Sequence, residues 1–135
     1  MKLQEHQTAR MNLVTRYGAD HVQINGVTLT GPCMVAPGLL EAPWISDAQA
    51  LTPEALARLW SLEPQVVLVG IARRDHPALK LLKGWLGQRQ IAVEVMDLGA
   101  ACRTYNVLAQ EDRPVVALLF PAPSSPPVSP GQHRA

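Results

Sequence analysis

Met96-Asp-Leu-Gly-Ala-Ala-Cys-Arg-Thr-Tyr-Asn106 joins a strand pattern to a helix pattern, and this junction decides the fold of the chain. Residues 91–96 before it form an apolar run typical of a β-strand. After it, apolar residues recur at helical spacing, at Leu98, Ala101, Tyr105 and Leu108. The stretch therefore predicts a strand followed by a helix over about residues 98–109, with an acid, a thiol, a guanidinium, a phenol and an amide gathered at the junction.

The same alternation extends to both sides of this stretch. Residues 66–69 are a continuous apolar run closed by Gly70, which indicates a strand covered on both faces. Pro77 begins a second helix with one apolar face, formed by Ala78, Leu82, Trp85 and Leu86. Residues 115–120 form the last predicted strand. Strands joined by helices of this length are expected to be parallel with right-handed crossovers, so the second half is predicted to be β-α-β-α-β.

The first half is predicted to be mostly β. Residues 21–30 indicate a hairpin, because Asn25-Gly26 tolerates the positive φ angles of a tight turn. A short strand is expected at residues 33–36 and a weaker extended piece at residues 39–44. Thr52 and Pro53 then begin a helix that ends at Pro64, with a stripe formed by Leu56, Leu59 and Trp60. The fold class is therefore α/β with an N-terminal β-hairpin region.

Length and composition indicate one domain. The 135 residues are 47% hydrophobic and 17% charged, which suits a single core. Residues 1–16 are polar and are expected to be a flexible N-terminus, residues 17–120 form the α/β domain, and residues 121–135 are expected to be a disordered Pro/Ser-rich tail.

Charge and segment patterns exclude several classes of protein. The net charge is +1 and Lys and Arg do not form a run, so we expect no nucleic-acid partner. The first ten residues lack the apolar core of a secretory signal, and no integral membrane segment is expected, so we predict a cytoplasmic protein. Cys33 and Cys102 are isolated in sequence and are interpreted as reduced thiols.

The candidate site lies at one edge of the predicted parallel sheet. The loops after Val69 and Met96 open at the same edge, where ligand clefts of α/β sheets form. The candidate binding residues there are Arg73, Arg74, Asp97, Cys102, Arg103, Tyr105 and Asn106, with Asp75 and His76 close by in sequence. Arg73 and Arg74 could bind an anion or simply be solvated.

Each group on the predicted helix also has a structural interpretation. Asp97 is expected to cap the helix, with an acid or base role as the alternative. Cys102 is expected to be a small buried residue rather than a nucleophile. Arg103 is expected to pair with Asp97 or Glu94 rather than with a ligand. The phenol and amide that follow, Tyr105 and Asn106, would tie the helix to neighbouring backbone or contact a partner.

Familiar reaction signatures are missing from the sequence. There is no GxxxxGK[ST], GxSxG, HExxH or CxxC, and the four histidines show no metal-ligand spacing. We therefore assign no catalytic residue, metal or cofactor, and an enzyme would need an unfamiliar site.

Residues 94–109 and Glu111-Asp-Arg-Pro-Val115 resemble a known family, and Met96 to Asn106 is its most specific part. It is the small α/β domain shared by the mitochondrial complex I (NADH dehydrogenase) assembly factor 3, the adipogenesis-associated domain protein and uncharacterised bacterial and archaeal proteins, a domain of unknown function. The resemblance implies a three-layer sandwich around a short, largely parallel sheet, and no established activity, metal or cofactor. Gly70-Ile71-Ala72 departs from the Gly-Thr-Gly loop of many relatives.

Two hypotheses follow for the function. The first is a non-catalytic protein-interaction module, such as an assembly factor for a respiratory or other multiprotein complex, which predicts an exposed patch and an unknown protein partner. The second is a small-ligand binder or hydrolase-like enzyme, which predicts a closed cleft where Asp97, Cys102 and Arg103 converge. Oligomeric state is not predicted.

Overall fold

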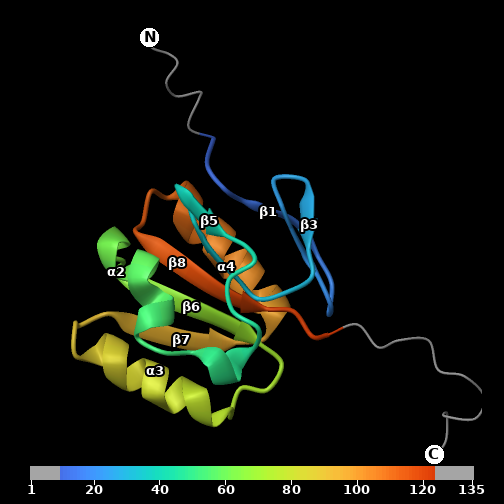
Figure 1. The fold of residues 1–135 in the computed structure, drawn as a ribbon. Coiled ribbons are helices and arrows are strands. Elements are labelled where there is room, and N and C mark those ends of the chain that lie inside the picture. Colours follow the sequence, from blue (N-terminus) through green and yellow to red (C-terminus); the bar gives the residue numbers. More distant parts are fainter. Residues whose placement is uncertain (1–9, 124–135) are drawn as a thin grey trace, which may run out of the picture.

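A computed structural model describes residues 10–123, whose strands form two sheets (Figure 1). The smaller sheet is antiparallel and consists of β1 (Val14–Tyr17), β2 (Val22–Ile24) and β3 (Val27–Leu29). The larger sheet has the order β5-β4-β8-β6-β7, formed by β5 (Leu39–Glu41), β4 (Cys33–Ala36), β8 (Val115–Phe120), β6 (Val66–Ile71) and β7 (Ala92–Met96). The expectations for residues 1–9 and 124–135 lie outside the described residues.

The predicted β-α-β-α-β second half is confirmed. β6 pairs in parallel with β7 on one side and with β8 on the other, whereas β4 joins β8 in antiparallel fashion. Because the chain passes from β6 to β7 and then back across to β8, two right-handed crossovers place the connecting helices on opposite faces. These helices are α3 (Pro77–Gly87) and α4 (Leu98–Gln110).

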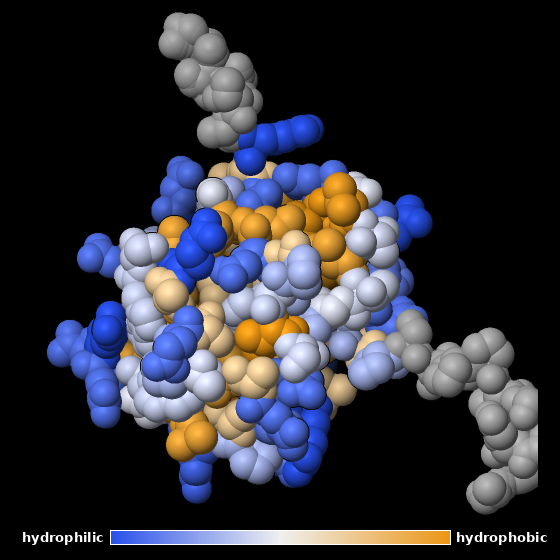
Figure 2. All heavy atoms as spheres, viewed as in Figure 1, coloured by the Kyte–Doolittle hydropathy of each residue, from blue (hydrophilic) through white to orange (hydrophobic). Residues whose placement is uncertain are grey.

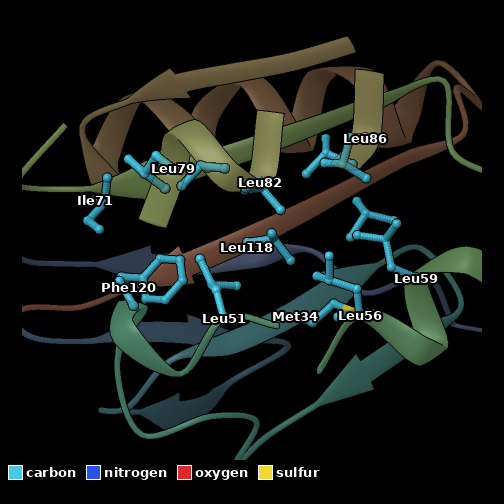
Figure 3. Close-up of a cluster of buried hydrophobic side chains, with 14 of the residues drawn as sticks. Met34, Leu51, Leu56, Leu59, Ile71, Leu79, Leu82, Leu86, Leu118 and Phe120 are labelled. Atoms are coloured by element: carbon cyan, nitrogen blue, oxygen red, sulfur yellow. The ribbon is translucent and has the colours of Figure 1, made fainter. Parts of the chain in front are cut away.

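The result is the expected three-layer α/β arrangement. α3 covers one face together with α2 (Ala57–Leu62) and the short 3-10 turns η1 (Ala48–Ala50) and η2 (Glu54–Leu56), while α4 and the smaller sheet cover the other. Figure 3 shows Leu79, Leu82 and Leu86 of α3 pointing toward the side chains of the sheet and of α2. No helix within residues 10–123 is long and apolar enough to span a bilayer.

The central strand β8 is buried at all six positions because both of its faces are covered. Val116, Leu118 and Phe120 face α3, and the alternate residues face α4. The hairpin is also confirmed, since Asn25 and Gly26 have φ angles of 48° and 89°. The predicted cap at Thr52 is present, because its Oγ1 accepts a hydrogen bond from the Ala55 N–H at 3.1 Å.

Strand β1 was not predicted. Residues 14–16, which the sequence placed in the flexible N-terminal segment, form three of its four residues. Its local pattern is weak because only Val14 is buried, and it is held both by antiparallel pairing with β2 and by contacts with α4, more than 90 residues later. A short window of sequence does not display the contacts with α4.

Candidate functional site

The carboxyl ends of β6, β7 and β8 meet at one edge of the sheet, and a pocket of about 380 Å³ lies there. We call it the edge pocket. The chain leaves β6 toward one face and β7 toward the other, which opens a crevice between the two strand ends. The edge pocket is lined by Tyr17, Gly18, Ala19, Ala72, Asp97, Leu98, Gly99, Phe120 and Ala122. The predicted position of the site is thus occupied by a pocket with mainly apolar walls.

Asp97 borders the edge pocket as the cap of α4. Its Oδ1 accepts a hydrogen bond from the Ala100 N–H at 2.8 Å, and its backbone is extended. The carboxylate therefore neutralises part of the positive end of the helix and satisfies a free N–H group. This is the structural interpretation that the sequence favoured.

Arg103 forms a contact that the sequence did not predict. Its Nη1 donates a hydrogen bond to the phenol oxygen of Tyr17, and its guanidinium carbon lies 5.9 Å from the centre of that ring. Within the described residues it forms no ion pair with Asp97 or Glu94, because Glu94 is exposed on the edge strand β7 and Asp97 is used as a cap. The hydrogen bond that Arg103 donates to Tyr17 raises the pKa of Arg103 above its ordinary value, with a smaller contribution from the charge of Asp97.

Gly99 makes room for this pair. A Cβ atom at Gly99 would lie 2.9 Å from Cε1 of Tyr17 and 3.3 Å from Nη1 of Arg103. The missing side chain therefore lets the Tyr17 ring lie against the first turn of α4. Sequence alone offered a weak signal for this contact, namely a glycine in a helix turn where alanine would form a better helix.

Arg73 and Arg74 do not share one environment. Arg73 lines a second pocket of about 370 Å³, which adjoins the edge pocket, since Ala72, Phe120 and Ala122 line both. Its Nε lies 3.2 Å from Oδ1 of Asp75, with both side chains highly exposed. Arg74 lines a different pocket, at the first turn of α3.

Cys102 lies on the inner side of α4 and is 1% exposed. Burial raises the pKa of its thiol to about 12, although the Arg103 charge opposes this shift. Cys33 is fully buried in the same cluster, and its pKa is also raised to about 12, by burial and by the neighbouring Cys102. A thiol that stays protonated inside the core is a poor nucleophile.

Tyr105 and Asn106 attach α4 to the N-terminal strand. The buried Tyr105 phenol donates to the backbone oxygen of Asn12 at 2.7 Å, and burial raises its pKa. The Asn106 amide donates to the Val14 oxygen at 2.8 Å and accepts from the Val14 N–H at 2.9 Å. Asn106 thus pairs with β1 as a neighbouring strand would.

The seven predicted residues are therefore divided among several environments. Asp97 lines the edge pocket, Arg103 contacts its Tyr17 wall, and Arg73 and Arg74 line two other pockets. The other three residues serve the fold: Cys102 and Tyr105 are buried in the core, and Asn106 is half-buried against β1. The sequence did not predict that Tyr17, Gly99 and Phe120 belong to the site. No group of three or more His, Cys, Asp or Glu side chains within residues 10–123 could hold a metal ion.

Comparisons with known proteins give a consistent set of relatives. Residues 14–120 match the family described as "Protein of unknown function (DUF498/DUF598)". The chain is 31% identical over 125 residues to the human NADH dehydrogenase [ubiquinone] 1 alpha subcomplex assembly factor 3, covering 91% of this chain and 68% of that protein. The rat protein of the same name is 32% identical over 112 residues, covering 82% of this chain and 60% of its own length. The chain thus spans about two thirds of these relatives.

Solved structures support the same fold. An NMR structure from Xanthomonas campestris superposes with a TM-score of 0.77 at 27% identity, covering 94% of this chain and 97% of that one. A Bordetella pertussis protein described as a Mth938-like domain superposes with a TM-score of 0.69 at 29% identity, covering 93% of this chain and 95% of that one.

Proposed function

The chain belongs to the family described as protein of unknown function (DUF498/DUF598), and from this premise we propose that it is a non-catalytic interaction module that assists assembly of a multiprotein complex. The observation that carries the proposal is how the reactive groups of residues 96–106 are used. The acid caps a helix, the thiol is buried, and the phenol and amide bind backbone. Four of the groups that could perform chemistry are engaged in holding the fold.

The surface left at the sheet edge suits binding rather than reaction. The edge pocket has mainly apolar walls that include Tyr17, and Arg103 is hydrogen-bonded to the Tyr17 hydroxyl. Aromatic and arginine side chains are enriched in protein interfaces, where they combine apolar area with directed hydrogen bonds. The names of the relatives point to the same class, since they are assembly factors of NADH dehydrogenase. We propose a respiratory complex as the first complex to test.

The enzyme hypothesis receives less support from this geometry. It requires Asp97, Cys102 and Arg103 to converge on one cleft. Instead, the Cys102 thiol lies in the core with a pKa of about 12, and the Arg103 guanidinium is held by Tyr17 outside it.

Deletion of the gene in the source organism tests the proposal. Complexes are separated on native gels and identified by mass spectrometry, with NADH dehydrogenase quantified first. We expect a smaller amount of at least one mature complex and accumulation of its subassemblies, restored by the wild-type gene. The Arg103→Ala variant should restore assembly less well than Arg113→Ala, a matched exposed arginine after α4. Unchanged levels of all complexes in the deletion strain would exclude the assembly role.

A further inference from the structure

The outer face of α3 concentrates positive charge in a chain that is nearly neutral overall. Five of the twelve Lys and Arg residues fall within residues 73–89, where Asp75 is the only carboxylate. Arg73 is paired with Asp75, and Arg89 lies over the Trp60 ring at 4.2 Å. The exposed side chains of Arg74, Lys80 and Lys83 have no ion-pair partner in the part of the chain that the structure describes.

These three cations line a pocket of about 450 Å³ at the first turn of α3, together with Asp75, whose carboxylate is paired with Arg73. Pro77 and Leu79 contribute apolar atoms to its wall, and His76 caps the helix, with its Nδ1 accepting from the Ala78 N–H at 3.0 Å. The positive end of the 11-residue helix adds to the potential of the three side chains. A carboxylate placed there would be attracted by all of these charges.

An exposed leucine lies on the outward side of the same helix, next to Lys80 in sequence. Leu81 is 57% exposed, although the other leucines of α3 are buried against the sheet. In Figure 2 hydrophilic side chains project along the lower rim of the molecule, where Figure 1 places α3. We define Arg74, Lys80, Leu81 and Lys83 as the α3 face.

We propose that the α3 face is the docking site for an acidic segment of a protein partner, in which Asp or Glu side chains flank an aliphatic residue. Charge complementarity selects the acidic residues, and Leu81 selects the aliphatic one. A polypeptide supplies both, whereas a nucleic acid would use only the charges, and a net charge of +1 gives the whole chain little attraction to a polyanion. This inference rests on the proposed function, since it states the chemistry of the partner that an assembly module holds.

Carbodiimide cross-linking tests the contact directly, because it joins a lysine amine to a carboxylate only when the two touch. The chain has three lysines, and two of them, Lys80 and Lys83, belong to the α3 face. The tagged full-length protein is cross-linked in a lysate of its source organism, and the linked peptides are sequenced by mass spectrometry. We expect links from Lys80 or Lys83 to a segment of one partner that holds several acidic residues and an aliphatic one.

Matched variants separate contact from charge. Lys80→Arg with Lys83→Arg keeps the charge but removes the amines, so the cross-link should disappear while the partner still copurifies. Lys80→Glu with Lys83→Glu should lower copurification about tenfold or more, and Leu81→Ala should lower it severalfold. Arg113→Lys, added to the double arginine variant, places one lysine elsewhere and measures random cross-linking. Melting curves verify that each variant is folded.

Several results would overturn the inference. These are links no more frequent than those of the Arg113→Lys control, links only to isolated carboxylates with no further acidic or aliphatic residue nearby, or equal copurification by the double glutamate variant. Binding that depends on Lys80 and Lys83 but occurs only to phosphatidylglycerol vesicles or duplex DNA would also overturn it. The two proposals can fail separately. If specific links form with the tagged protein but the deletion strain assembles all its complexes normally, the docking site is supported and the assembly role is excluded.

Discussion

At the scale of single residues, Gly70 determines how closely α4 approaches the sheet. A Cβ atom there would lie 2.7 Å from Cβ of Ala101 and 3.2 Å from Cα of Leu98. We expect Gly70→Ala to lower the free energy of unfolding by about 1–3 kcal/mol, because the backbone of the helix must move outward. Urea denaturation measures this change. The control is Gly84→Ala on the open side of α3, which should raise stability by up to about 1 kcal/mol. Wild-type stability of Gly70→Ala would contradict the close packing.

The two buried thiols give a second prediction at this scale. Cys33 and Cys102 are 0% and 1% exposed, and their pKa values of about 12 leave almost no thiolate near neutral pH. We expect iodoacetamide at pH 7.5 to modify neither residue in the folded chain within an hour, and to modify both in guanidinium chloride. Intact-mass spectrometry counts the labels. Rapid labelling of Cys102 alone would revive the nucleophile hypothesis.

Local chemistry made some residue roles predictable and left others hidden. The cap at Asp97 and the turn at Asn25-Gly26 follow from groups a few residues away, so the sequence displays them. The Tyr17–Arg103 contact joins residues 86 positions apart, and no local pattern marks it. A local pattern therefore indicates only nearby carboxylates as partners of Arg103.

At the scale of elements, β1 is held by the side chains of α4. Asn106→Ala removes both hydrogen bonds to Val14, and we expect a loss of about 1–3 kcal/mol because each bond contributes about 1 kcal/mol. Hydrogen exchange at the Val14 amide should accelerate more than exchange in β6. Gln110→Ala, exposed on the same helix, serves as the control. Unchanged exchange at Val14 would show that β1 does not depend on α4.

At the scale of the whole molecule, apolar periodicity and the handedness rule were sufficient for the second half. They predicted the parallel strands, the opposite placement of two helices and the edge where a pocket lies. They did not predict which side of α4 carries each polar group. Asn106 and Arg103 are three residues apart and both bind β1, at Val14 and at Tyr17, because the smaller sheet covers that helix.

The pH dependence of stability follows from the two buried thiols of the core, Cys33 and Cys102. Unfolded cysteines ionise near pH 8.5, whereas the folded chain keeps Cys33 and Cys102 protonated to about pH 12. The folded pKa values are raised, so this contribution to stability is complete below about pH 8 and is lost as the pH rises, at up to about 1.4 kcal/mol per pH unit for each thiol. We expect the free energy of unfolding, measured with urea under a reducing agent, to fall by about 3 kcal/mol between pH 7.5 and 9.5. Ionisation of Tyr105, whose pKa is also raised, becomes important only at higher pH.

The Cys33→Ala, Cys102→Ala double variant is less stable at every pH because of its cavities, but its stability should fall much less over this interval. Equal slopes for the two proteins would mean that these thiols do not control the alkaline limit of the fold.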